Sequence, residues 1–141
     1  MEIADSYSVV VTDRLHECRD FYRDHFGFEV VFDSSWFVLV SAGGARASSL
    51  AFMHSSHPSS PPSPAPFRGD GSFVTFQVAD AKAEYERLAA DGAEFALELT
   101  EEPWGQRRFG LVDPAGMWVD VVEQIEPAAG WWDPYLEGAD Q

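Results

Sequence analysis

Side chains that could bind a metal ion or attack a substrate are few in this sequence. The four histidines are His16, His25, His54 and His57, and only the last two have a spacing typical of metal ligands. Because His54 and His57 fall in a stretch rich in serine and proline, a linker role is favoured over metal binding. Cys18 is the only cysteine, so it has no disulfide partner and no second cysteine for a zinc site.

No pair of residues forms an evident nucleophile and base. Cys18 and His16 are two residues apart on an expected helix, and side chains at that spacing point in different directions. The sequence also lacks the Gly-x-Ser-x-Gly pattern that places a catalytic serine on a sharp turn. Covalent catalysis is therefore not favoured.

The elements that must position any site occur twice in the same order. The run from Tyr7 to Val11 predicts a strand, and Thr12-Asp13 after it is typical of a helix N-cap. Apolar residues three or four apart predict a helix from Asp13 to about Phe26, ended by Gly27. Three further strands are expected, over Phe28–Phe32, Trp36–Val40 and Leu50–Met53.

A linker over residues 54–71, rich in Ser, Pro and Gly, precedes a second set of elements. A strand over Phe73–Val78 and an N-cap at Ala79-Asp80 lead into a helix that ends near Gly92. The remaining expected strands cover Glu94–Leu97, Arg107–Val112 and Met117–Val122, with a turn over Asp113–Gly116. The pattern predicts an α+β fold of two βαβββ modules, over about residues 5–53 and 72–124, followed by a tail over 125–141.

Several stretches of the sequence are characteristic: FQVAD, YERLAADGAEF and above all GQRRFGLVDPAG in the second half, and VVVTDRLHECRDFYRDHFGFEVVF in the first half. With these stretches the sequence resembles the vicinal oxygen chelate superfamily, which contains glyoxalases, bleomycin resistance proteins and extradiol dioxygenases. The similarity covers about residues 5–125. The resemblance implies a single domain in which two modules curl into a cup around a ligand or metal ion, and it implies a homodimer.

In metal-dependent members of this superfamily, the first and last strand of each module supply His, Glu or Gln ligands. The resemblance places these positions at Ser6 (or Ser8, if the register shifts by two), Ala51, Phe73 and Asp120. Alanine and phenylalanine have no atom that could coordinate an ion, and one aspartate is too little to hold a catalytic divalent metal. We therefore expect no metal and no other cofactor.

Alternation along the strands predicts which residues face the cup. Ser6, Ser8 and Val10 are expected there, while Tyr7, Val9 and Val11 are expected to pack on the first helix. In the second module, Val74, Phe76 and Val78 should meet the helix. The expected ligand-binding residues are Trp36, Phe73, Thr75, Gln77, Trp104, Trp118 and Asp120, although core packing of the aromatic residues remains an alternative reading.

Arg107 and Arg108 lie in the same stretch as Trp104. They either bind an anionic group or, in the favoured reading, neutralise Glu101, Glu102 or Asp113. The tail contains two adjacent tryptophans, and it is expected to dock on the domain or on a second chain, because so many rings are costly to expose.

The charge and hydrophobicity of the sequence exclude some classes of binding partner. Lys and Arg number 9 against 24 Asp and Glu, a formal net charge of -15, which disfavours nucleic acid and anionic membranes as partners. No apolar run approaches the roughly 20 residues that span a bilayer, and the first residues do not have the order of a signal peptide, so a cytoplasmic protein is expected.

The favoured function is binding and sequestration of a small aromatic compound, which can be cationic, without a metal ion. Antibiotic resistance proteins of this superfamily sequester their antibiotic in this way. The alternatives are a metal-dependent lyase, isomerase or dioxygenase, and a metal-free enzyme that uses Asp120 as a base.

Overall fold

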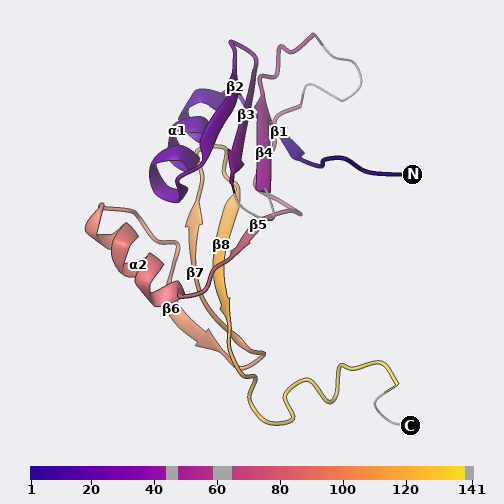
Figure 1. The fold of residues 1–141 in the computed structure, drawn as a ribbon, viewed down its shortest axis with the longest axis vertical. Helices are drawn as coiled ribbons and strands as arrows, with labels where there is room; N and C mark the ends of the chain where they lie inside the picture. Colours follow the sequence, from indigo (N-terminus) through magenta and orange to yellow (C-terminus); the bar gives the residue numbers. More distant parts are fainter. Residues whose placement is uncertain (44–47, 59–64, 139–141) are drawn as a thin grey trace. The chain divides into compact units, whose positions relative to one another are not determined.

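The computed structural model describes residues 1–43, 48–58 and 65–138, and it divides the chain into two compact units. The first unit comprises Met1–Ser72 together with Asp113–Met117, and the second comprises Phe73–Val112 together with the chain from Trp118 onward. In the described residues each unit contains one helix and one four-stranded sheet (Figure 1). Three stretches lie outside the described residues: 44–47, then 59–64 of the predicted linker, and 139–141 of the predicted tail.

The first unit has the order strand, helix and three strands. Its elements are β1 (Ser8–Val11), α1 (Leu15–Phe26), β2 (Glu29–Asp33), β3 (Phe37–Ala42) and β4 (Ser48–Met53). In the sheet the strands lie in the order β1-β4-β3-β2, with β1 parallel to β4 and the other neighbours antiparallel. Helix α1 covers one face of this sheet (Figure 1).

The core of the first unit lies between α1 and the sheet. Tyr22 is fully buried on the helix, and its ring stacks on that of Phe52 with 5.5 Å between centroids. Val38 and Val40 are also fully buried on β3. Burial of an apolar side chain of this size contributes about 1.5–3 kcal/mol, so these contacts fix the helix on the sheet. Gly27 ends α1 in the left-handed conformation at φ 70°, as its residue type predicts.

The start of α1 differs from the expectation. The helix begins at Leu15, and its N-cap is Arg14, which has no side-chain cap. Thr12 instead accepts a hydrogen bond from the Arg14 backbone N–H at 3.1 Å. The Asp13 carboxylate accepts from the backbone N–H and the hydroxyl of Ser55 at 3.0 and 2.5 Å. The expected cap residue is therefore used to hold the segment that follows β4.

The predicted faces of β1 are wrong by one residue. Val10 is buried opposite Phe52, which faces α1, whereas Tyr7 and Val9 are 48% and 42% exposed. Three consecutive valines carry no alternation of polarity, so the sequence of this strand does not fix its register. The strand's pairing with β4 decides the orientation.

The second unit repeats the topology. Its elements are β5 (Val74–Gln77), α2 (Ala81–Ala90), β6 (Leu97–Glu102), β7 (Gln106–Val112) and β8 (Trp118–Gln124). The strand order is β5-β8-β7-β6, again with only the first pair parallel. Asp80 caps α2 by accepting a hydrogen bond from the Ala83 N–H at 3.0 Å. The predicted α+β fold of two βαβββ modules is confirmed.

Strand β6 lies further along the chain than predicted. The expected strand, Glu94–Leu97, ends where the observed one begins, and β6 runs on to Glu102. It is an edge strand with only intermediate or exposed residues, so its acidic sequence lacks the apolar signal of a buried strand. Neither helix in the described part of the chain is long and apolar enough to cross a membrane.

Candidate functional site

An apolar hollow of about 640 Å³ lies on the first unit's sheet, on the face opposite α1. Pairing of Phe37 with Met53, and of Leu39 with Phe32, brings these four side chains to one face, while Val38 between them is buried. The lining residues are Val31, Phe32, Trp36, Phe37, Leu39 and Met53. Of these only Trp36 was expected at a binding site.

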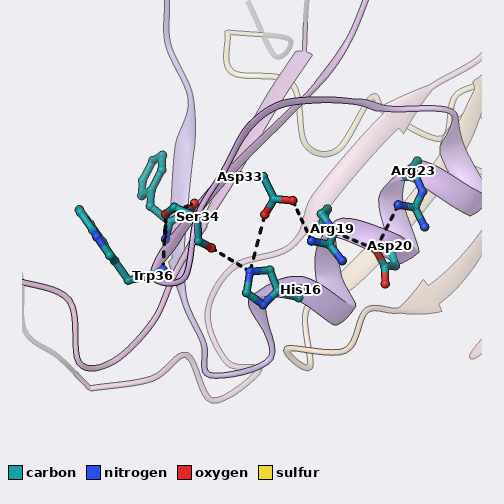
Figure 2. Close-up of polar contacts among 8 residues, drawn as sticks. His16, Arg19, Asp20, Arg23, Asp33, Ser34 and Trp36 are labelled. Carbon is teal, nitrogen blue, oxygen red and sulfur yellow. Dashed lines mark hydrogen bonds and ion pairs between the residues drawn. The ribbon is translucent and has the colours of Figure 1, made fainter.

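The turn between β2 and β3 positions Trp36 at this hollow, and α1 anchors the turn (Figure 2). The Ser34 hydroxyl accepts hydrogen bonds from the backbone N–H groups of Phe37 at 2.9 Å and Trp36 at 3.4 Å. On the helix side, His16 Nε2–H donates to the Ser34 carbonyl at 2.8 Å. Arg19 binds Asp33 at 2.9 Å. Trp36 is 38% exposed, so its ring is available to a ligand.

Five of the predicted site residues lie on or beside β5 and β8 of the second unit. Thr75 pairs directly with Asp120, which places both on the face opposite α2. Gln77 accepts a hydrogen bond from Gln124 Nε2 at 3.2 Å on the same two strands. Phe73 precedes β5 and is 62% exposed. The structure thus brings Thr75 and Asp120 together and leaves Phe73 outside the sheet.

Asp120 is buried and surrounded by donors. Arg108 Nη1 lies 3.3 Å from Asp120 Oδ1, and Trp118 Nε1 lies 3.4 Å from the same oxygen. The Trp118 indole covers Gly110 so closely that a Cβ there would overlap the ring. Asp120 is thus held in an ion pair with Arg108.

Trp104 lies in the turn between β6 and β7 and is half-buried. The Arg108 guanidinium carbon is 5.4 Å from the centre of its ring, a cation–π contact. Its Nε1–H donates to Gln106 Oε1 at 2.9 Å. The tail covers the turn, because the Trp131 ring lies 5.8 Å from that of Trp104 and Trp132 Nε1–H donates to the Trp104 carbonyl at 2.7 Å. The described tail therefore docks on the second unit.

The two arginines neutralise carboxylates, as the favoured reading expects. Arg107 binds Glu101 at 2.6 Å and Glu123 at 3.0 Å. Arg108 lies 3.7 Å from Glu102 in addition to Asp120. The sequence did not identify Glu123 and Asp120 as partners, because those pairs depend on the register of β7 against β8.

Asp113 belongs to the first unit and has a different partner from those expected. Its carboxylate accepts a hydrogen bond from the Tyr22 hydroxyl at 2.7 Å and from the Met117 N–H at 2.9 Å. Burial raises the pKa of Asp113, and the Tyr22 hydrogen bond opposes that shift. Burial likewise raises the pKa of Tyr22, and it raises that of Cys18 to about 12. Cys18 is therefore a thiol rather than a nucleophilic thiolate.

The residues at the positions that the resemblance assigns to metal ligands do not fit a metal ion. Ala51 is fully buried and has no donor atom, Phe73 has none either, and Ser6 is exposed ahead of β1. Ser8, the alternative to Ser6, is an exposed hydroxyl, which is a weak ligand, and Asp120 is already paired with Arg108. Among residues 1–43, 48–58 and 65–138 no group of three or more His, Cys, Asp or Glu side chains could hold an ion.

The two histidines of ligand-like spacing do not complete a metal site. His54 lies 3.5 Å from Asp13 and shares a 2.8 Å hydrogen bond with Ser56 through Nδ1. His57 is buried, and neither of its ring nitrogens has a hydrogen-bond partner in the described part of the chain.

Comparison with known proteins agrees with this fold. The chain matches a solved glyoxalase/bleomycin resistance protein/dioxygenase from Nocardioides with a TM-score of 0.71 and 20% identity, over 89% of this chain and 86% of that one. A lactoylglutathione lyase from Agrobacterium tumefaciens matches with a TM-score of 0.66 and 23% identity, over 85% and 92%.

A superfamily member from Sphaerobacter thermophilus is 26% identical, with a TM-score of 0.65, over 86% of this chain and 98% of that one. None of the curated protein sequences compared with the chain matches it. The sequence profile of the Glyoxalase/Bleomycin resistance protein/Dioxygenase superfamily matches residues 5–121. With most of its length matched, the chain belongs to this superfamily.

Proposed function

We propose that this protein binds and sequesters a small aromatic molecule without the help of a metal ion. The observation that carries the proposal is the hollow on the first unit, where three aromatic and three aliphatic side chains face one space of about 640 Å³. Sites for drug-sized ligands have volumes of about 300–1,000 Å³ and are mainly apolar. The hollow therefore suits a flat apolar body better than a sugar or a nucleotide.

The rings in the hollow supply the recognition. Trp36, Phe37 and Phe32 give a ligand surfaces to stack on, and ring pairs contribute about 0.5–1.5 kcal/mol beyond the burial of area. The anchoring of the β2–β3 turn by α1 fixes Trp36 before the ligand arrives, which lowers the entropy cost of binding.

A cationic ligand is favoured over an anionic one. The formal net charge of -15 raises the local concentration of cations around the whole protein. For the second unit taken by itself, we propose polar and aromatic ligand contacts by Phe73, Thr75, Gln77, Trp104, Trp118 and Asp120. Together these features support an antibiotic resistance role by sequestration.

The rival function is a metal-dependent enzyme, and the Agrobacterium tumefaciens relative titled lactoylglutathione lyase gives it some support. The chemistry of Ala51 and Phe73 opposes that function here, because neither side chain can coordinate an ion. Elemental analysis of the purified protein distinguishes the two. Near-stoichiometric metal, with turnover that a chelator abolishes, would replace the binding proposal.

Isothermal titration calorimetry with a panel of planar cationic antibiotics that includes bleomycin tests the proposal directly. We expect saturable binding by the wild-type protein, weakened about tenfold or more by Trp36→Ala, because the ligand loses a stacking surface. Tyr135→Ala is the matched control, since this ring is 64% exposed and packs on Trp131 and Trp132 of the second unit's tail. Equal affinity of Trp36→Ala and the wild type would rule out the hollow as the binding site.

We also propose that the chain forms a homodimer. Exposed apolar side chains also occur outside the hollow, on and beside the edge strand β1, where Tyr7 and Val9 are 48% and 42% exposed. Such patches often mark protein interfaces. Light scattering coupled to size exclusion measures the mass, and a monomer at all concentrations tested would contradict the proposal.

A further inference from the structure

Two carboxylates on the second unit share a single guanidinium. Arg108 lies 3.3 Å from Asp120 and 3.7 Å from Glu102, and the three side chains are 24%, 7% and 18% exposed. Register explains the arrangement: Arg108 on β7 faces the same side as Asp120 on β8 and as Glu102 on β6. A carboxylate as buried as that of Asp120 requires a cationic or hydrogen-bonding partner.

The guanidinium is fixed in place from the side as well. Trp104 packs against it at 5.4 Å, and Trp104 is in turn fixed by Gln106 and by the tail residue Trp132. A planar guanidinium held between two carboxylates and an aromatic face loses little further freedom when it forms these contacts. Arg108 is therefore a partly buried side chain of this sheet face, in contact with two carboxylates and one ring.

We propose that Arg108 is a built-in cation that balances Asp120 and Glu102 and so keeps divalent metal ions off this face of the second unit. Asp120 is the one carboxylate among the positions that the resemblance assigns to metal ligands, and here the positive charge comes from the chain itself. A divalent ion would have to displace the guanidinium or approach it against charge repulsion. This proposal goes beyond ligand binding in the hollow, and its test does not depend on whether the hollow binds a ligand.

Titration with Mn²⁺ tests this role, with free Mn²⁺ measured by electron paramagnetic resonance. The wild-type protein should show no saturable binding up to about 1 mM, the weak end of protein sites for divalent ions. Arg108→Gln leaves two uncompensated carboxylates, so it should bind Mn²⁺ at least about tenfold more tightly. Arg108→Lys keeps the charge and should resemble the wild type. The double variant Arg108→Gln, Asp120→Asn should lose the tighter Mn²⁺ binding that Arg108→Gln alone gains.

Two results would overturn the proposal. The first is saturable Mn²⁺ binding by the wild-type protein that Asp120→Asn abolishes, because the ion would then share the site with Arg108. The second is a folded Arg108→Gln variant that binds Mn²⁺ no better than the wild type. Failure of the proposed aromatic ligand to bind would change neither outcome.

Arg108→Gln alone can also fail to fold, because it leaves charge uncompensated on a buried group. In that case the Arg108→Gln variant is refolded with and without Mn²⁺, and the recovery of its native fold is followed by circular dichroism. Recovery with Mn²⁺, or on adding Asp120→Asn, supports the charge-balancing role. Recovery with neither shows that Arg108 acts through packing, and that result contradicts the proposal.

Discussion

The hydrogen bond between Tyr22 and Asp113 gives a stability prediction whose size depends on pH. Tyr22→Phe removes the hydroxyl that donates to the buried carboxylate at 2.7 Å, while the ring remains stacked on Phe52. A hydrogen bond to a charged group is worth about 1.5–3 kcal/mol, against about 0.5–1.5 kcal/mol for a neutral pair. We expect the variant to lose about 1.5–3 kcal/mol of unfolding free energy at a pH above the raised pKa of Asp113, where the carboxylate is charged.

The pH dependence follows from the direction of the Asp113 pKa. Burial raises this pKa above its ordinary value of 3.8, so the folded state holds the proton more tightly than the unfolded state. The stabilisation from protonated Asp113 is present below 3.8 and is lost as the pH rises through the raised value. Tyr22→Phe raises the folded pKa further, because the hydroxyl lowers it in the wild type. The difference between variant and wild type should therefore shrink on acidification.

Urea denaturation followed by circular dichroism, at pH 7 and near pH 3.5, measures this difference. Tyr85→Phe is the matched control, because the Tyr85 hydroxyl also donates to a carboxylate, that of Glu98, but at an exposed position. At pH 7, Tyr85→Phe should lower the free energy of unfolding by less than Tyr22→Phe does. A loss for Tyr22→Phe that is the same at both pH values would refute the reasoning, since it would show that the charge of Asp113 does not strengthen the bond.

Three other perturbations have expected outcomes. Gly110→Ala should destabilise the protein by about 1–3 kcal/mol in thermal denaturation, because the added Cβ overlaps the Trp118 ring; an unchanged midpoint would show that the ring moves freely. Cys18 should resist Ellman's reagent in the native state at pH 8, since burial raises its pKa to about 12, and fast labelling would contradict its burial. His16→Ala should weaken ligand binding more than His16→Gln, because glutamine can still donate to the Ser34 carbonyl; calorimetry that finds both variants equal would exclude this anchoring role.

Much of the fold could be predicted from sequence because its signals are local. The apolar spacing of α1, the cap at Asp80 and the glycine at the end of α1 each act within a few residues. The face of β1 could not be predicted, because Val9 and Val10 are equally apolar and only the pairing with β4 separates them. Strand β6 was misplaced because an exposed edge strand has no apolar signal.

The candidate site was predictable only in part. Trp36 was expected as a ligand contact, but the hollow around it depends on an irregularity between Val30 and Phe32 that no residue type indicates. The charges of Arg107 and Arg108 indicated ion pairs, yet the pairing with Asp120 depends on which residues of β7 and β8 lie opposite each other. Contacts that depend on register between distant strands cannot be predicted from one sequence.

The docking of the tail on the β6–β7 turn has an optical consequence. Trp104, Trp131 and Trp132 form a chain of rings with centroids 5.8 and 4.8 Å apart, whereas Trp36 lies in the other unit. Indole transitions at such separations couple as excitons, so the docked tail should give the circular dichroism spectrum a paired positive and negative band in the far ultraviolet, where the intense indole transition lies. That band would report release of the tail in the native protein without a label.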